Sequence, residues 1–362
     1  MSDRVGILTF LRTLNYGAML QSYALYRFLS DEGFDCEQID YRNQAIEAFE
    51  YRIPQTLKAR VANVWRARHI IRKAAAFEGF LDSYIRVSGK VDKSSLSRLD
   101  DVYDYIVVGS DQVWNGFCTG FDSSYFLDFL EDGKKKKTYA VSIGQDSLPK
   151  TERIDYGKLL PCFSGGILVR EQTAIESIRS YAGESVPVHA VIDPTLLVGE
   201  EVWRDLSSDT RAEEDYVFVY TVGERARTVK TGKILSRKLG CKLVVLQQNY
   251  GMPVVGATNL YDISPLDFLS YIRGAKYVVT SSFHGLCFAI QFNKPFVVCL
   301  NSGPEKRNSR IVDLLKTLRL ENRIASDEDV PVERTIDWVA VNSVLGNERS
   351  ASRNRLLESL RG

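Results

Sequence analysis

Strand-like and helix-like segments alternate along almost the whole 362-residue chain, and this alternation limits the folds that it can adopt. Near the start, residues 5–10 form a short apolar run, residues 17–29 carry apolar side chains at helical spacing, and residues 36–41 are again strand-like. A strand, a helix and a second strand in succession favour a parallel sheet, because parallel strands need a long crossover connection. We therefore predict an α/β protein with mostly parallel sheets.

The alternation breaks once, at a polar stretch from Ser207 to Asp215, and then starts again. A domain averages about 150 residues, so a chain of this length suits two. We expect α/β domains over residues 1–206 and 207–332, and a helical tail over 333–362 that packs back on the N-terminal domain. The other predicted strands are 105–110, 138–143, 166–169, 188–197, 216–222, 242–246, 277–280 and 296–300, and the other predicted helices are 45–82, 226–239, 265–273, 285–292 and 305–319.

The composition excludes several classes of protein. There are 47 Lys and Arg against 46 Asp and Glu, a net charge of +1, so no global field favours nucleic acid or an anionic membrane. No stretch approaches the ~20 apolar residues of a membrane span, and the apolar run at residues 5–8 is too short for a signal peptide. The six cysteines form no Cys-x-x-Cys pair and the three histidines are scattered, so we expect a reduced, cytoplasmic protein without a bound metal or cofactor.

Two local basic stretches are hidden by this balance. Residues 52–73 contain Lys and Arg but no acid, which fits either a solvated helix face or a peripheral contact with the inner face of a membrane. Lys134 to Lys137 are four consecutive lysines after Asp132-Gly133. We interpret this run as a solvated turn, with anion steering as the alternative.

Polar residues follow several predicted strands at their carboxyl ends, where ligands bind in open α/β sheets. The loop from Thr9 to Ala18 joins the first strand to the first helix, and Gly17 permits close backbone approach there. The chain has no Gly-x-Gly-x-x-Gly and no Walker lysine, so we expect no ordinary dinucleotide or ATP site. After the strand that starts at residue 105, Asp111 is either a general base or, together with Ser110, the cap of the next helix.

Three further positions carry chemistry. Arg170 directly follows an apolar strand, where its planar fork either binds a carboxylate or phosphate ligand or forms an ion pair with Glu171 or Asp193. His284 stands at the positive end of a helix dipole, which favours a neutral imidazole able to act in acid–base chemistry. The basic cluster 306–310 precedes a helix, where it either binds phosphate or only caps the helix start.

Together these residues resemble the polysaccharide pyruvyl transferases over roughly residues 5–320. The resemblance rests on the order and spacing of several short motifs. They are Gly6-Ile7-Leu8-Thr9-Phe10, Asn15-Tyr16-Gly17-Ala18 with Gln21, the segment Gly109-Ser110-Asp111-Gln112-Val113-Trp114-Asn115, Tyr139-Ala140-Val141-Ser142-Ile143-Gly144, Val169-Arg170-Glu171, Asp193-Pro194-Thr195 and Thr280-Ser281-Ser282-Phe283-His284-Gly285.

The resemblance implies two facing Rossmann-like domains of the GT-B kind, phosphoenolpyruvate as donor and a pair of glycan hydroxyls as acceptor. The product is a pyruvate ketal on a capsule, exopolysaccharide or cell-wall glycan, and the family associates an arginine matching Arg170 and a histidine matching His284 with donor binding and catalysis. We place the donor on the C-terminal domain, at Ser281, Ser282, His284, Gly285, Arg310 and Lys306, and expect Arg170 to be a further donor-binding residue. We place the acceptor, which is either free or lipid-linked, on the N-terminal domain, at Arg12, Asn15, Tyr16, Gln112, Trp114 and Asn115.

In the expected reaction, His284 protonates the donor and Asp111 deprotonates a sugar hydroxyl, with no metal required. This chain departs from the family in one respect, because Ser282 and Phe283 stand where many members carry a basic residue before the histidine. Arg310, Lys306 or Arg12 is a candidate to replace that cation. The alternatives are a nucleotide-sugar glycosyltransferase of the GT-B kind and an inactive glycan-assembly protein.

Overall fold

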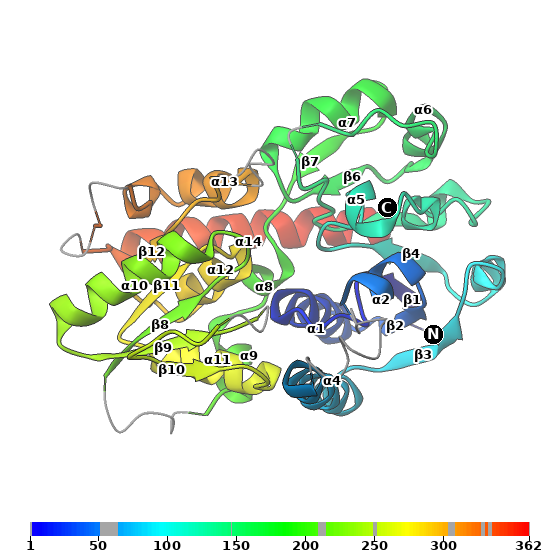
Figure 1. Ribbon diagram of the computed structural model, residues 1–362. Coiled ribbons are helices and arrows are strands. Elements are labelled where there is room, and N and C mark those ends of the chain that lie inside the picture. Colours follow the sequence, from blue (N-terminus) through cyan, green and yellow to red (C-terminus); the bar gives the residue numbers. More distant parts are fainter. Residues whose placement is uncertain are drawn as a thin grey trace. The chain divides into compact units, whose positions relative to one another are not determined.

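The computed structural model describes residues 2–50, 64–145, 147–208, 215–248, 252–302, 308–326, 330–331 and 335–361, without the side chains of 48–50 (Figure 1). The chain forms two compact units. The first contains Met1–Arg52, Leu81–Val198 and Gly346–Gly362, and the second contains Ile53–Phe80 and Gly199–Leu345.

The first unit is built on a five-stranded sheet of order β3-β2-β1-β4-β5 in which every pair of strands is parallel. A second, two-stranded sheet pairs β6 with β7, and Val141 bridges to both Asp111 and Val169. The strands are β1 (Arg4–Leu8), β2 (Asp35–Tyr41), β3 (Val87–Val91), β4 (Tyr105–Val108), β5 (Lys136–Thr138), β6 (Ile167–Val169) and β7 (Val188–Ala190). The helices are α1 (Tyr16–Asp31), α2 (Gln44–Glu50), α5 (Gly116–Thr119), α6 (Tyr156–Leu159), α7 (Ile175–Ala182) and α8 (Pro194–Leu197).

The second unit repeats this architecture with a parallel sheet of order β10-β9-β8-β11-β12. Its strands are β8 (Tyr216–Tyr220), β9 (Lys242–Leu246), β10 (Thr258–Leu260), β11 (Tyr277–Thr280) and β12 (Phe296–Val298). Its helices are α9 (Glu200–Leu206), α10 (Arg225–Leu239), α11 (Pro265–Gly274), α12 (Phe283–Gln291) and α13 (Ser309–Thr317). Two long helices, α4 (Val64–Tyr84) and α14 (Trp338–Arg361), each have residues in both units.

In each sheet the first strand lies in the middle, because the chain builds outward on one side and then returns to build on the other. The reversal lies between β1 and β4 in the first unit and between β8 and β11 in the second. Such a switch point is where ligands bind in open α/β sheets. The predicted site loops after β1, β4 and β11 all begin at these reversals.

The last part of the chain is held on the first unit by side chains of α14. Arg353 forms a bidentate pair with Glu32, through Nε at 2.8 Å and Nη2 at 2.9 Å. The Ser352 hydroxyl accepts from the backbone of Ile192 at 3.1 Å, and Arg349 donates to the carbonyl of Leu196 at 2.9 Å. These contacts lie inside the first unit, to which residues 346–362 belong.

Several local expectations need correction. The lysine run is not simply a solvated turn, because Lys136 and Lys137 form β5 and are 5% and 4% exposed. Burial lowers the pKa of Lys137, whose ammonium group lies 5.2 Å from the Tyr105 ring centroid. The predicted strand 188–197 ends at Ala190, since Asp193 caps the short helix α8, and β3 and β10 were not predicted.

Gly285 is a position where the fold requires the absence of a side chain. A Cβ atom there would lie 2.4 Å from Thr280 Oγ1 and 2.9 Å from Tyr220 Cδ1. We expect Gly285→Ala to lower the free energy of unfolding by about 1–3 kcal/mol, the usual cost of overpacking. The control is Gly346→Ala in α14, where a Cβ meets no described atom within 4 Å and alanine favours the helix by about 1 kcal/mol. Urea unfolding measures both; equal stability of Gly285→Ala and the unsubstituted chain would contradict the packing argument.

Candidate functional site

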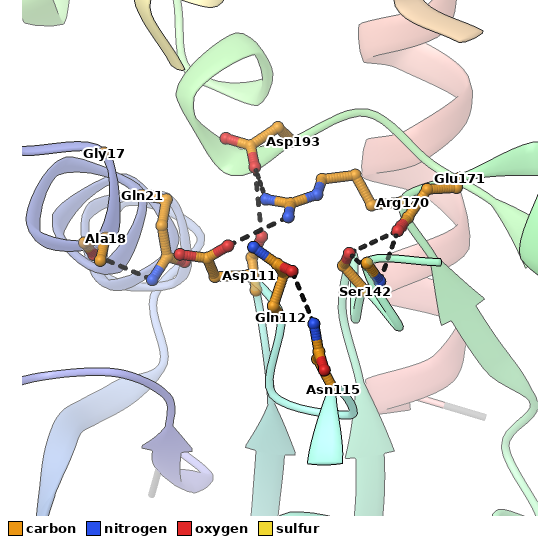
Figure 2. Close-up of polar contacts among 12 residues, drawn as sticks. Gly17, Ala18, Gln21, Asp111, Gln112, Asn115, Ser142, Arg170, Glu171 and Asp193 are labelled. Carbon is orange, nitrogen blue, oxygen red and sulfur yellow. Dashed lines mark hydrogen bonds and ion pairs between the residues drawn. The ribbon is translucent and has the colours of Figure 1, made fainter. Parts of the chain in front are cut away.

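Arg170 lies between two carboxylates at the carboxyl end of β6 (Figure 2). Its Nη1 is 2.8 Å from Asp193 Oδ2, and its Nη2 is 3.1 Å from Asp111 Oδ1. The arginine side chain is 1% exposed, and the Asp111 and Asp193 side chains are 8% and 0% exposed. Ser110 adds a hydroxyl that donates to Asp193 at 3.2 Å. We call Ser110, Asp111, Arg170 and Asp193 the arginine cluster.

The charges of the arginine cluster explain why its cation is stable in the interior. Burial alone would lower the pKa of Arg170, but the carboxylates of Asp111 and Asp193 outweigh burial and raise it. Of the two interpretations of Arg170, the ion pair with Asp193 is the one observed, joined by a second pair with Asp111. Both terminal nitrogens therefore face protein carboxylates, and the cluster's one arginine is outnumbered by its two acids.

The Asp111 backbone is also unusual, with a φ of 71°, in the left-handed region. The cap of α5 is Asn115, whose Oδ1 accepts from the backbone of Phe117 at 3.1 Å. The interpretation of Ser110 and Asp111 as a helix cap is therefore wrong, and the Asp111 carboxylate is directed to Arg170 instead. Asn115 Nδ2 donates to Gln112 Oε1 at 2.9 Å, so these two predicted acceptor residues bind each other (Figure 2).

Glu171, next to Arg170, has a separate role. Its carboxylate is fully buried and accepts from the Ser142 hydroxyl and, at 3.2 Å, from the backbone of Gly144 (Figure 2). It thereby joins the strand end at 169 to the loop after β5. The sequence alone marks Asp193 and Glu171 as ion-pair partners and as parts of family motifs, but it gives them no place in the site, because sequence gives no distance between strand ends.

The loop after β1 is fixed to the loop after β4. The Thr9 hydroxyl donates to the carbonyl of Ser110 at 2.8 Å and accepts from Gln21 Nε2 at 3.0 Å. Asn15 caps α1 by accepting from the backbone of Gly17 at 2.9 Å, and Tyr16 is fully buried. The two predicted acceptor residues Asn15 and Tyr16 thus support the loop rather than extend from it.

Arg12 is the predicted acceptor residue that borders a pocket. Its guanidinium holds Asp40 through Nε at 3.1 Å and Nη2 at 2.9 Å, and its side chain is 17% exposed. The small pocket beside it is lined by Thr9, Phe10, Leu11, Arg12, Tyr41, Asn43, Ile46, Glu47 and Tyr125. Hydroxyl, aromatic and charged groups therefore meet next to the switch point of the first unit.

The structure does not offer Trp114 as a surface for a sugar ring. Trp114 is 1% exposed, stacks on Phe126 with centroids 4.9 Å apart, and donates from Nε1 to the carbonyl of Tyr125 at 2.8 Å. It belongs to the core. The exposed aromatic of this segment is Phe117, 65% exposed, whose ring meets Phe121 edge-on at 5.5 Å. Its position on the first turn of a helix after a strand end was the available signal.

In the second unit, hydroxyl groups join the ends of β8 and β11. Thr280 Oγ1 donates to the carbonyl of Tyr220 at 2.8 Å, and Ser281 Oγ accepts from the backbone of Val222 at 3.1 Å. Ser282 caps α12 by accepting from the backbone of Gly285 at 3.3 Å. The predicted donor residues Ser281, Ser282 and Gly285 therefore form the turn that presents the start of α12.

His284 occupies the first turn of α12 and is 6% exposed. Its ring centroid lies 5.2 Å from that of Phe283, and the guanidinium carbon of Arg310 lies 5.7 Å from the centroid of the same Phe283 ring. Arg310 belongs to the first turn of α13. The structure thus brings a cation to the residue before the histidine, while Lys306 lies outside the described residues. We call residues 281–285 with Arg310 the histidine turn.

Within the described part of the chain, no three His, Cys, Asp or Glu side chains are arranged to hold a metal ion. Among the described residues, no helix is both long enough and apolar enough to cross a membrane.

Several solved structures share the fold of this chain, and the matches cover nearly all of its residues. Arabidopsis thaliana UGT89C1 complexed with UDP-L-rhamnose is 9% identical, over 99% of this chain and 100% of that one, with a TM-score of 0.52. S. aureus MnaA with UDP is 11% identical, over 99% and 91%, with a TM-score of 0.51. A putative UDP-N-acetylglucosamine 2-epimerase from Listeria monocytogenes is 10% identical, over 98% and 90%, with a TM-score of 0.50. These likenesses confirm the predicted fold, two Rossmann-like domains of the GT-B kind.

No curated protein matches the chain. The family model for polysaccharide pyruvyl transferase, however, matches residues 15–303. That stretch includes the switch point of the second unit, the arginine cluster and most of the histidine turn. By this match, the chain belongs to the polysaccharide pyruvyl transferase family.

Proposed function

We propose that the protein transfers pyruvate from phosphoenolpyruvate to a pair of glycan hydroxyls, as a cyclic ketal, during synthesis of a capsule, an exopolysaccharide or a cell-wall glycan. Membership of the family supports transfer of pyruvate to a polysaccharide. The observation that supports this donor is the histidine turn, where Arg310 stands over the ring of Phe283, the residue before His284 at the start of α12. A cation and a helix start together favour a ligand with phosphate and carboxylate groups.

The donor anion belongs on the histidine turn because the arginine cluster repels it. Phosphoenolpyruvate is strongly negative, and the arginine cluster contains Asp111 and Asp193 against a single arginine that both already bind. In our scheme Arg310 supplies the cation that many family members carry before the histidine. Arg170 then acts as a positioning residue that holds Asp111, instead of the donor ligand that the sequence suggested.

The reaction needs one acid and one base. A proton from His284 adds to the methylene carbon of the donor and makes the neighbouring carbon electrophilic, while Asp111 accepts the proton of the attacking sugar hydroxyl. The carbon–oxygen bond to phosphate breaks, and a second sugar hydroxyl closes the ketal. One hydroxyl proton restores the acid and the other leaves with phosphate, so the products are the ketal and inorganic phosphate.

On the acceptor side, Phe117 is better placed than Trp114 to contact a sugar. It follows the Asn115 cap, and 65% of its surface is exposed. An exposed aromatic face packs well against the C–H face of a sugar ring. Arg12, at the pocket beside the neighbouring loop, supplies a polar contact in this scheme.

The first prediction concerns the donor. Phosphoenolpyruvate at about 100 times its Kd should stabilise the protein by about 2.7 kcal/mol, seen as a rise in Tm. Arg310→Met should abolish most of this rise, whereas Lys316→Met, which removes an exposed cation from the same helix, should not. A rise produced by nucleotide sugars and not by phosphoenolpyruvate would favour the glycosyltransferase alternative, and the absence of any rise would favour an inactive protein.

The second prediction separates a positioning role of Arg170 from a donor-binding role. Removing one partner of a buried ion pair costs about 3–5 kcal/mol, so Arg170→Met should lower the free energy of unfolding by that amount. The control Arg204→Met breaks the exposed pair with Glu200 and should cost no more than about 1 kcal/mol. Urea unfolding gives both values. A fully stable Arg170→Met variant that no longer responds to phosphoenolpyruvate would restore the donor-binding role.

The third prediction concerns Phe117. Fluorescently labelled protein should bind glycans on an array of bacterial polysaccharides, and Phe117→Ala should bind them at least tenfold more weakly, since stacking contacts carry much of the affinity for sugars. Val339→Ala, which shortens another exposed side chain, is the control. The response to phosphoenolpyruvate should be unchanged in both variants. Equal glycan binding by Phe117→Ala and Val339→Ala would rule out this contact.

A further inference from the structure

The N-terminal half of α4 lies in a basic, acid-free part of the chain. Residues 51–77 include no Asp or Glu, whereas the first acids after them are Glu78 and Asp82. The basic residues of this stretch are Arg52, Lys58, Arg60, Arg66, Arg68, Arg72 and Lys73. The structure describes this stretch from Val64 onward. The net charge of +1 for the whole chain conceals this local excess.

The two sides of α4 differ sharply. Ile70, Lys73 and Phe77 are buried, and they recur at the three- and four-residue spacing of one helix face. The opposite side carries Val64, Trp65, Arg68, Ile71 and Arg72, which we call the α4 face. Its apolar members are 61%, 49% and 68% exposed for Val64, Trp65 and Ile71. Large apolar side chains this exposed are costly in water, and here they lie among arginines.

Contacts within the second unit hold this helix in place. Trp65 packs edge-on against Tyr261 at 4.7 Å, and His69 Nδ1 lies 3.0 Å from Asp262 Oδ2. Asp262 is also 3.8 Å from Arg72 Nη1, a distance that gives only weak pairing of an arginine whose side chain is 54% exposed. Asp262 is thus the acid that approaches the α4 face within the described residues, and one carboxylate does not balance the arginines.

We propose that the α4 face binds the surface of a bilayer that contains anionic phospholipid. Exposed Trp and aliphatic side chains enter the interfacial region of a bilayer, while neighbouring arginines attract anionic headgroups. Nucleic acid would satisfy the arginines but would leave Val64 and Ile71 in water, so the apolar members favour the membrane. The proposal goes beyond pyruvyl transfer and does not depend on it. It gives the enzyme a place where a lipid-linked glycan is accessible.

The test is sedimentation of the full chain with vesicles of phosphatidylcholine, with and without phosphatidylglycerol. We expect binding to the anionic vesicles that weakens at high salt, because exposed charges are screened. Substituting both arginines, in Arg68→Gln/Arg72→Gln, should weaken binding by about fivefold for each arginine removed. Ile71→Ser should also weaken it. The matched controls are Lys230→Gln/Arg237→Gln on α10 and Val339→Ser on α14, which should bind as the unsubstituted chain does.

Several outcomes would overturn the proposal. These are no binding to either vesicle, equal binding to both, or equal binding by the Arg68/Arg72 variant and its α10 control. Stronger binding to a duplex oligonucleotide than to the anionic vesicles, lost in the same variant, would assign the face to nucleic acid instead. Because stabilisation by phosphoenolpyruvate should be the same in every α4 variant, failure of the proposed donor and failure of the membrane contact give different results.

Discussion

Parallel strand pairing places the carboxyl ends of all strands along one edge of each sheet, and both candidate sites follow from this constraint. In each unit the chain begins in the middle of the sheet and reverses direction once, so the loops after the two central strands meet at the reversal. The hydrogen bonds from Thr9 to Ser110 and between Ser281 and Val222 join those loops directly. The residues that each bond joins are about 100 residues apart in the first unit and about 60 in the second. The topology of the sheet brings them together, since they are not neighbours in the sequence.

The two edges carry opposite chemistry. The first unit buries Asp111, Asp193 and Glu171 around a single arginine, whereas the second has His284 next to Phe283, whose ring lies below Arg310. A buried arginine with two carboxylates is held rigidly, because moving it would leave uncompensated charge in the interior. Rigidity of that kind suits a group that orients a base. It suits poorly a group that must bind and release an anion at every turnover.

Much of the fold could be predicted from the sequence, because the local periodicity of apolar residues indicates where strands and helices form. The strands at 242–246 and 277–280 agree with the predicted bounds to the residue, and α10, α11 and α14 begin or end within a few residues of theirs. The strands β3 and β10 were not predicted, because residues such as Gly89 and Asn259 interrupt their apolar patterns. The burial of Lys136 and Lys137 could not be predicted either. In the sequence the four lysines are equivalent, and only the pairing of β5 with β4 distinguishes the buried ones.

The roles of site residues were harder to predict, because they depend on partners far away in sequence. Arg170 pairs with Asp111, 59 residues earlier, and with Asp193, 23 residues later. No local pattern distinguishes that arginine from one that faces a ligand. The same holds for Trp114 and Phe117, three residues apart, of which one is core and the other surface. The family match covers residues 15–303, but only the geometry of the charges shows that side chains such as Arg170 are held by protein carboxylates.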